Sequence, residues 1–321
     1  MRLAILDDHA HLALKLTDWS QIEARCAIEV FDQPAGDDEE AARKLAPFDI
    51  LCHMRERMPM SGSLIEKLPN LKFMTITGRS HRTLDMAAAT RRGILISGTS
   101  EGAGSPNGTP ELAWGLVLCT ARHIAYEDRL MRSGGWQHTA GMVLDKKTLG
   151  LLGLGKIGKR MAEYAKVFGM EVIAWSQNLT AEAAASVGVR RVDKKELLQS
   201  SDVLSIHVVL SERTRGLIGA DDLALMKPTA ILVNTSRGPI VDEAALIEAL
   251  SNKRIRGAGL DVYDYEPLPE NSPLRQLDNV VLTPHLGYAS EDGMRSFYTD
   301  TVAAVEAFLD GKPIRVVNQK G

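Results

Sequence analysis

The sequence predicts an α/β protein built from two doubly wound domains, each with a parallel β-sheet covered by helices. Three observations lead to this prediction. The chain has 321 residues, more than a single hydrophobic core usually supports. Short apolar runs rich in β-branched residues alternate with longer helical patterns along most of the chain, as they do in parallel α/β sheets. A turn-rich stretch, GTSEGAGSPNGTP at 98–110, separates two such series.

The first series is long enough to form a complete open sheet by itself. Helical patterns, such as SGSLIEKLP (61–69) and LDMAAATRRG (84–93), separate some of its strands. The expected strands are RLAIL (2–6), AIEVF (27–31), DILCH (49–53), LKFMTIT (71–77) and GILIS (93–97).

A helix is expected directly after the turn-rich stretch. Thr109 can cap it, and Pro110 then occupies the first helical position, where proline is favoured. The following residues LAWGLVLC (112–119) are apolar on nearly every side of a helix. Such a helix is buried on several faces, either in a core or against another subunit.

The second series begins near Lys147 and contains six expected strands. A helical pattern from Ser290 to Leu309 then returns to complete the first domain. We therefore expect a first, substrate domain of residues 1–102 and 287–321, and a second domain of residues 103–286. The six strands are TLGLLG (148–153), EVIAW (171–175), VLSIHVV (203–209), AILVN (230–234), GAGLDV (257–262) and NVVLT (279–283).

Composition excludes several classes of protein. A formal net charge of −3 provides no basic field to attract nucleic acid or an anionic membrane. No apolar stretch approaches the roughly 20 residues needed to span a bilayer, and the opening residues read as a strand instead of a signal peptide. Cys26, Cys52 and Cys119 show no paired spacing, so we expect no disulfide framework, no metal site and a cytoplasmic location.

A glycine-rich loop points to a dinucleotide. The segment GLGKIG (153–158) directly follows an expected strand and precedes a helical stretch. Gly153 permits the tight turn, Gly155 lets the backbone approach a pyrophosphate, and Gly158 lets helix pack on strand. Lys156 and Ile157 complete the loop, and the helix N-terminus presents free N–H groups to the phosphates. The second domain is therefore predicted to bind a dinucleotide.

The choice between NAD and NADP stays open at this stage. In an NAD site the next strand usually ends in an acid that bonds the ribose 2′-hydroxyl. Here the strand EVIAW is followed by Ser176, Gln177 and Asn178. The missing carboxylate removes repulsion toward a 2′-phosphate, yet no arginine stands beside these residues in the sequence to attract one.

Three polar side chains follow strands of the second series. Arg237, Glu266 and His285 come after AILVN, GAGLDV and NVVLT, so they emerge at the sheet edge that carries the glycine loop. An arginine can hold a substrate carboxylate through two hydrogen bonds. A histidine can donate a proton to a developing alkoxide, and a carboxylate bonded to it favours its charged form. His207 is a rival histidine but has no acid and arginine placed to cooperate with it.

These residues resemble the D-isomer-specific 2-hydroxyacid dehydrogenase family. The matching segments are GLGKIG, VNTSRGPIVDEAAL, AGLDVYDYEPLP and LTPHLGY, spread over 149–288, whereas the first hundred residues match loosely. The resemblance implies a Rossmann-type nucleotide domain inserted in a flavodoxin-like substrate domain. It also implies that the family's arginine, glutamate and histidine are Arg237, Glu266 and His285, and that the protein is a homodimer joined through the nucleotide domain.

The resemblance assigns further residues to the two ligands. It implies that Asp261 holds the nicotinamide carboxamide, and that backbone N–H groups of the TGRS segment meet the substrate carboxylate. Ser176 replaces the acid common in NAD-preferring members, and GRSHRTLD differs from the commoner glycine-rich version. The other expected cofactor residues are His207, Val208, Val209, Thr235, Ser236 and Gly287; the expected substrate residues, besides Arg237, are Arg55, Gly78, Arg79 and Ser80.

We therefore expect an NAD- or NADP-dependent dehydrogenase that transfers a hydride to or from the 2-position of a small 2-hydroxy or 2-oxo acid. Basic residues near two strand ends of the first domain suit a glyoxylate- or hydroxypyruvate-type substrate, including a phosphate of the latter. Three alternatives compete. One is a formate dehydrogenase, in which a glutamine usually replaces Glu266. The others are a non-catalytic NAD-sensing corepressor or scaffold, and another Rossmann enzyme such as an adenosyl-cofactor hydrolase or methyltransferase.

Overall fold

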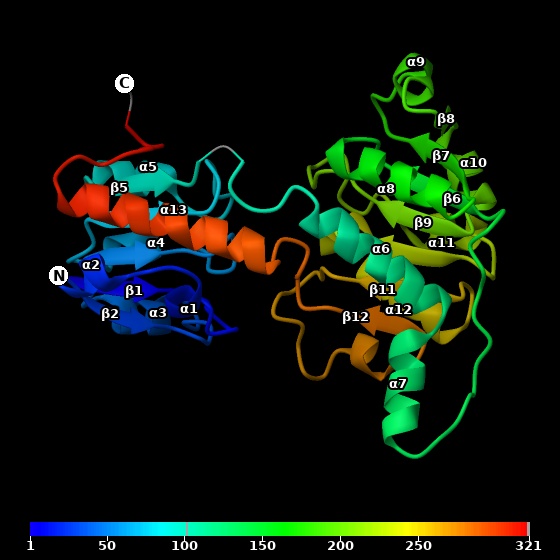
Figure 1. The fold of residues 1–321 in the computed structure, drawn as a ribbon, viewed down its shortest axis with the longest axis horizontal. Helices are drawn as coiled ribbons and strands as arrows, with labels where there is room; N and C mark the ends of the chain where they lie inside the picture. Colours follow the sequence, from blue (N-terminus) through cyan, green and yellow to red (C-terminus); the bar gives the residue numbers. More distant parts are fainter. Residues whose placement is uncertain (101, 320–321) are drawn as a thin grey trace. The chain divides into compact units, whose positions relative to one another are not determined.

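The computed structural model describes residues 1–100 and 102–319 as two compact units. Glu101, within the expected turn-rich boundary, and residues 320–321, at the end of the expected first domain, lie outside the described residues. One unit comprises residues 1–106 and 289–321, and the other comprises residues 107–288. Each unit contains one all-parallel sheet with helices on both faces (Figure 1), which confirms the predicted fold class.

The first unit is built on a five-stranded sheet in the order β2-β1-β3-β4-β5, the order of flavodoxin-like folds. The apolar side chains of the central strands are buried on both faces, as parallel strands require. The strands are β1 (Arg2–Ile5), β2 (Ala27–Val30), β3 (Ile50–Cys52), β4 (Phe73–Ile76) and β5 (Leu95–Gly98).

Helices of the first unit cover both faces of this sheet. The helices are α1 (Ala13–Leu16), α2 (Ser20–Glu23), α3 (Asp38–Leu45), α4 (Gly62–Glu66), α5 (Met86–Arg91) and α13 (Glu291–Leu309). Helices α3, α4 and α5 share one apolar cluster with the sheet. Helix α13 begins after Ser290, whose hydroxyl accepts a hydrogen bond from the Gly293 N–H. Its Phe308 stacks on Phe73 of β4 with ring centroids 4.3 Å apart, so the expected returning helix is part of this unit.

The second unit is built on a seven-stranded sheet in the order β12-β11-β10-β9-β6-β7-β8. Renumbered within the unit, the order 3-2-1-4-5-6-7 extends the Rossmann pattern, and its switch point lies between β6 and β9. Ligands of such sheets bind outside the carboxyl ends of the strands at this point. The strands are β6 (Thr148–Leu152), β7 (Glu171–Trp175), β8 (Arg190–Arg191), β9 (Val203–Ile206), β10 (Ile231–Asn234), β11 (Gly257–Leu260) and β12 (Val280–Leu282).

Two apolar clusters flank the second sheet. Helices α10, α11 and α12 contribute to one cluster, and helices α6, α8 and α9 contribute to the other. Only Glu111 of α6 is exposed, which confirms the predicted burial of this helix. The helices are α6 (Gly108–Ala121), α7 (Ile124–Arg132), α8 (Lys156–Val167), α9 (Ala181–Ala185), α10 (Lys194–Ser200), α11 (Ala220–Leu225) and α12 (Glu243–Ser251), with short 3₁₀ turns at Gly238–Ile240 and Pro273–Gln276.

All eleven expected strands are present, but two details differ from the prediction. The second series has seven strands instead of six, because β8 is a pair of arginines with no apolar pattern to mark it. Thr109 does not cap α6, because the helix already begins at Gly108. The Thr109 hydroxyl donates instead to the Gly287 carbonyl at 2.8 Å.

Candidate active site

The glycine-rich loop connects β6 to α8, and each of its three glycines is required for a different reason. Gly153 has φ +105°, and a Cβ there would lie 2.6 Å from the His207 carbonyl oxygen. A Cβ on Gly158 would lie 2.2 Å from the Gly153 carbonyl oxygen. A Cβ on Gly155, by contrast, would meet nothing within 4 Å. The chain's own packing therefore demands two of the glycines, whereas the third opens space at the N-terminus of α8, where a pyrophosphate binds in this type of loop.

This difference predicts opposite outcomes for two alanine substitutions. Gly158→Ala should lower the melting temperature by several degrees, because the methyl group forces α8 away from β6 at a cost of about 1–3 kcal/mol. Gly155→Ala should leave the melting temperature unchanged but weaken coenzyme binding at least about tenfold, because its methyl group occupies the space for phosphate. Thermal unfolding and calorimetric titration with the coenzyme measure the two effects. Unchanged coenzyme affinity in Gly155→Ala would contradict the assignment of the loop.

Two buried polar atoms that follow strands of the same sheet have no hydrogen-bond partner among the described residues. They are Nδ1 of His207, after β9, and Oγ1 of Thr235, after β10. The other ring nitrogen of His207, Nε2, lies 2.9 Å from Ser205 Oγ, and burial lowers the pKa of His207 to about 3, so the ring is neutral. A buried polar atom without a partner is costly. These atoms at the switch point therefore fit a site whose ligand supplies the missing hydrogen bonds.

The other expected cofactor residues lie around the same edge. Val208 is half-buried, and Val209 is 69% exposed, an unusual position for a large apolar side chain after a central strand. The Ser236 hydroxyl donates to the Ile206 carbonyl at 2.8 Å, so it ties the turn after β10 to β9. Residues 176–178 follow β7 without any acid among them.

His285 and Glu266 form a hydrogen-bonded pair. Nδ1 of His285 lies 2.5 Å from Oε2 of Glu266, and about one third of each side chain is exposed. The other carboxylate oxygen of Glu266 accepts the N–H of Tyr263 at 3.0 Å. Burial acts to raise the pKa of Glu266, but the hydrogen bond and the charge of His285 outweigh burial, so the net pKa is lowered. Because Nδ1 is occupied, Nε2 is the nitrogen available to a substrate.

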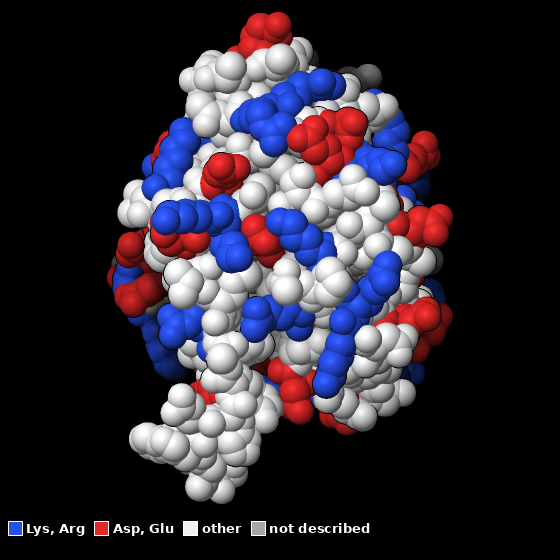
Figure 2. Space-filling view, turned by 90° about the vertical axis from the view of Figure 1, so that its right-hand side faces the viewer, with Lys and Arg blue, Asp and Glu red and all other residues white. Residues whose placement is uncertain are grey.

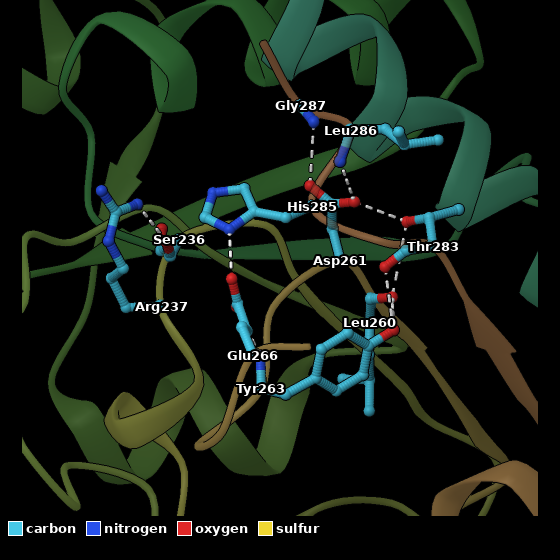
Figure 3. A network of polar contacts seen from close by, with 10 residues as sticks. All are labelled: Ser236, Arg237, Leu260, Asp261, Tyr263, Glu266, Thr283, His285, Leu286 and Gly287. Atoms are coloured by element: carbon cyan, nitrogen blue, oxygen red, sulfur yellow. Dashed lines mark hydrogen bonds and ion pairs between the residues drawn. The ribbon is translucent and has the colours of Figure 1, made fainter. Parts of the chain in front are cut away.

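The segment that carries His285 is anchored to the end of β11 by Asp261 (Figure 3). Oδ1 of Asp261 accepts hydrogen bonds from the Thr283 hydroxyl and the Leu286 N–H, both at 2.7 Å, and Oδ2 accepts the Gly287 N–H at 2.9 Å. His285 itself adopts a left-handed backbone conformation with φ +54°, which non-glycine residues rarely occupy. The strained residue is thus flanked by fixed hydrogen bonds that determine where the imidazole points.

Arg237 follows β10 on the other side of the imidazole. One of its terminal nitrogens donates to the Ser236 carbonyl at 2.7 Å, and its own carbonyl accepts from Asn234 Nδ2 at 3.0 Å. In the view of Figure 3, the ring edge of His285 that carries Nε2 is turned toward the side on which the Arg237 guanidinium lies. The charge of Arg237 also contributes to lowering the pKa of Glu266. The structure therefore brings all three predicted polar side chains to one edge of the second sheet.

The expected substrate residues of the first unit lie at the carboxyl ends of β3 and β4. The Arg55 N–H donates to Thr77 Oγ1 at 2.8 Å. The Gly78 N–H already donates to Thr99 Oγ1 at 2.8 Å, whereas the N–H groups of Arg79 and Ser80 have no hydrogen bond among the described residues. Arg79 and Ser80 are also exposed. This loop can offer two N–H groups to an anion.

Several positioning contacts were not predicted from the sequence. Tyr263 supports Glu266 through its N–H, and its hydroxyl donates to the Leu260 and Thr283 carbonyls at 3.1 and 2.9 Å. Tyr288 packs edge-on against His285, with ring centroids 5.8 Å apart. The three bonds to Asp261 were also missed. In the sequence, only the three-residue spacing between Tyr263 and Glu266 hints at their hydrogen bond. This spacing predicts a contact only once the turn between the two residues is known.

The described part of the chain contains neither a candidate metal site nor a candidate membrane-spanning helix. Within residues 1–100 and 102–319, no three His, Cys, Asp or Glu side chains are grouped to hold a metal ion. No helix in the same ranges is long and apolar enough to cross a bilayer.

Comparisons with known proteins agree with this geometry. Residues 114–287 match the family model described as D-isomer specific 2-hydroxyacid dehydrogenase, NAD binding domain. The chain is 40% identical to the glyoxylate reductase of Thermococcus litoralis over 266 residues, which cover 80% of each protein. It is 37% identical to the D-3-phosphoglycerate dehydrogenase of Methanocaldococcus jannaschii over 85% of this chain, but spans only 52% of that relative. A crystal structure of phosphoglycerate oxidoreductase from Vibrio cholerae o395 superposes with a TM-score of 0.90 at 34% identity, covering 97% of this chain and 99% of that one.

Proposed function

Since this chain belongs to the D-isomer-specific 2-hydroxyacid dehydrogenase family, we propose that it is an NAD(P)-dependent oxidoreductase that reduces a small 2-oxo acid to the 2-hydroxy acid, or catalyses the reverse. The observation that carries the proposal is the bond between His285 Nδ1 and Glu266 Oε2, next to Arg237 and at the same sheet edge as the glycine loop. This edge supplies a proton donor, a carboxylate-binding group and a coenzyme site together.

Each side chain has a definite part in the reaction. Arg237 holds the substrate carboxylate through its planar guanidinium. In the first unit, the exposed loop with the N–H groups of Arg79 and Ser80 is proposed to bind an anionic group. A bound reduced nicotinamide supplies the hydride that C2 receives. Nε2 of His285 donates its proton to the carbonyl oxygen as negative charge develops there. Asp261 Oδ2, which accepts one hydrogen bond from the Gly287 N–H, would accept a second from the nicotinamide carboxamide, and residues 207–209, Thr235, Ser236 and Gly287 would line the coenzyme.

Glu266 keeps His285 oriented through the bond to Nδ1. Burial acts to raise the pKa of Glu266, but its hydrogen bond to His285 and the charge of that residue lower this pKa on balance, so the carboxylate takes up a proton only below its ordinary pH range. In the wild-type protein the kcat/KM of reduction should therefore fall at acid pH as Glu266 is protonated. In Glu266→Gln this acid limb should be absent, because an amide does not titrate, and kcat/KM at neutral pH should be lower by about tenfold or more. A pH–rate profile measures both effects.

Glu243→Gln is a matched control for this profile. Glu243 is an acid of the same unit that accepts the Asp264 N–H at 3.1 Å, and no hydrogen bond or ion pair among the described residues joins it to His285. Its replacement should leave the profile in place. If Glu266→Gln keeps the wild-type profile, as Glu243→Gln should, Glu266 has no part in positioning His285.

The proposed activity is tested by a spectrophotometric screen of 2-oxo acids, each with NADH and with NADPH. The panel includes glyoxylate, hydroxypyruvate, its phosphate, pyruvate and branched 2-oxo acids. Reduction of any of them separates an enzyme from a coenzyme-sensing scaffold. Formate oxidation is a poor fit, because it leaves no hydroxyl proton for the His285–Glu266 pair to handle. The basic side chains near Arg79 support a substrate with a second polar or anionic group, and preference for branched apolar acids would contradict that detail.

We also propose a homodimer formed through the second unit. Helix α7 has no fully buried residue within the described part of the chain, although four of its residues are half-buried. The loop that follows it, residues 133–143, contains no charged residue and forms the uncharged projection at the bottom of Figure 2. Trp136 and Val143 in this loop are 74% and 67% exposed, and such apolar exposure marks an interface. Sedimentation should show a dimer that Trp136→Lys weakens.

The cytoplasm is the proposed compartment. All three cysteines, Cys26, Cys52 and Cys119, are free thiols, as expected in a reducing environment.

A further inference from the structure

The loop after β7 is where a Rossmann domain distinguishes NAD from NADP. Ser176 to Thr180 follow that strand, and none of them is acidic. A site selective for NAD places a carboxylate here to accept the ribose hydroxyls and repel a 2′-phosphate. Ser176, Gln177 and Asn178 instead offer one hydroxyl and two amide groups, all of which can donate to a phosphate.

The structure brings an arginine to this loop that its position in the sequence conceals. Arg191 lies twelve residues beyond Leu179, but β8 pairs with β7 so that Arg191 is opposite Ala174. The Nε–H of Arg191 donates to the Leu179 carbonyl at 2.7 Å. The guanidinium is thereby held against the loop between Ser176 and Thr180.

Only one edge of this guanidinium is occupied. An arginine has five N–H donors, and the bond to Leu179 uses one of them. Among the described residues, the two terminal nitrogens of Arg191 have no hydrogen-bond partner and form no ion pair within 4.0 Å, and the side chain is exposed. Two parallel donors from terminal nitrogens match the oxygens of a phosphate.

Neighbouring charges leave Arg191 available. The Glu182 backbone N–H and the Thr180 hydroxyl are the main causes that lower the pKa of Glu182, and the charge of Arg191 contributes least; no ion pair within 4.0 Å joins Glu182 to Arg191 among the described residues. Arg190, the neighbour on β8, is paired with Glu196 at 2.6 Å. Of the two arginines of β8, only Arg191 is therefore free to bind an anion.

We propose that the coenzyme is NADP(H), with its 2′-phosphate bound by Arg191 and by the uncharged donors of the Ser176–Asn178 loop. This inference rests on the proposed coenzyme site but goes beyond it, because it names the coenzyme and the residue that selects it. Arg191 is the specificity-determining residue, and the absence of an acid after β7 removes the repulsion that would oppose it.

The test is calorimetric titration of the full chain with NADP⁺ and with NAD⁺, without substrate. The wild-type protein should bind NADP⁺ more tightly. Arg191→Met keeps most of the side-chain volume but removes the charge, so NADP⁺ affinity should fall about 10- to 100-fold, the usual loss for hydrogen bonds to a charged group, while NAD⁺ affinity changes less than about twofold. Arg190→Met, one residue away on the same strand, is the matched control and should leave both affinities unchanged. Ser176→Asp should reverse the preference.

Three results of the binding experiments would overturn the inference. Tighter binding of NAD⁺ by the wild-type protein would exclude it. Equal weakening of both coenzymes by Arg191→Met would reduce Arg191 to a structural role, and unchanged NADP⁺ affinity would remove it from the site. Because binding is measured without turnover, the two proposals fail separately: NADP⁺ binding that depends on Arg191, with no oxo acid reduced, removes only the enzymatic activity. Reduction that uses NADH alone removes only this inference.

Discussion

Replacing His285 with asparagine should lower kcat for 2-oxo acid reduction by about 10²–10⁴, the usual contribution of a positioned general acid. Asparagine is chosen because His285 has φ +54°, and asparagine tolerates the left-handed region better than most residues. Its amide can donate a hydrogen bond from a similar position but cannot release a proton. Coenzyme affinity, measured by titration, should stay within about twofold of wild type, since His285 acts on the substrate oxygen.

His123→Asn provides a matched control for this variant. His123 also has a left-handed backbone, with φ +55°, and lies between α6 and α7, away from the carboxyl edge of the second sheet. Its replacement should leave kcat unchanged. Full activity in His285→Asn would show that the proton comes from elsewhere, and the proposed chemistry would then lose its donor.

Arg237 should be the second most sensitive position. Arg237→Lys retains the positive charge but removes the planar pair of donors, and kcat/KM should fall by about 10²–10³, consistent with loss of a hydrogen-bonded charge partner. Most of the loss should appear in KM and in the affinity for oxalate, a dicarboxylate with no ketone to reduce. Steady-state kinetics and inhibition by oxalate measure these two quantities.

Arg254→Lys is the control for this substitution. Arg254 is an exposed arginine of the same unit that donates to the Ala224 carbonyl at 2.7 Å, and its change should have no kinetic effect. A variant Arg237→Lys with wild-type kcat/KM would assign carboxylate binding to another group, and the arginine would then serve only to hold the turn after β10.

The fold could be predicted because its signals are local and repeated. Strands such as Leu149–Leu152 are continuous apolar runs buried on both faces, and each is separated from the next by a helical pattern. The glycine loop adds a backbone requirement that few structures other than a dinucleotide site impose. Strand β8 escaped prediction because it lies at the sheet edge and is held by backbone pairing with Ile173 and Ala174. Nothing in two consecutive arginines indicates a strand.

The sequence predicted which polar residues lie at the site, but not how their side chains are oriented. Arg237, Glu266 and His285 each follow a strand of a parallel sheet, so topology alone brings them to one edge. The orientation of His285 depends on a left-handed backbone and on three donors that converge on Asp261. These contacts join residues 22 to 26 positions apart, and no local pattern specifies them. The position of Arg191 was hidden for the same reason, because a cross-strand pairing determines it.

The hydrogen bond from Thr109 to the Gly287 carbonyl explains how one domain can be inserted within the sequence of the other. It holds the first and last residues of the unit 107–288 beside each other, as in a domain that is inserted into a loop of another domain. Inserting such a domain into a loop of another domain costs little loop-closure entropy. The two residues of that loop that flank the insertion are already close together, and the ends of the inserted domain match this spacing. The same adjacency makes residues 107–288 a natural fragment to express alone, and a short peptide in their place should suffice to reconnect the remainder.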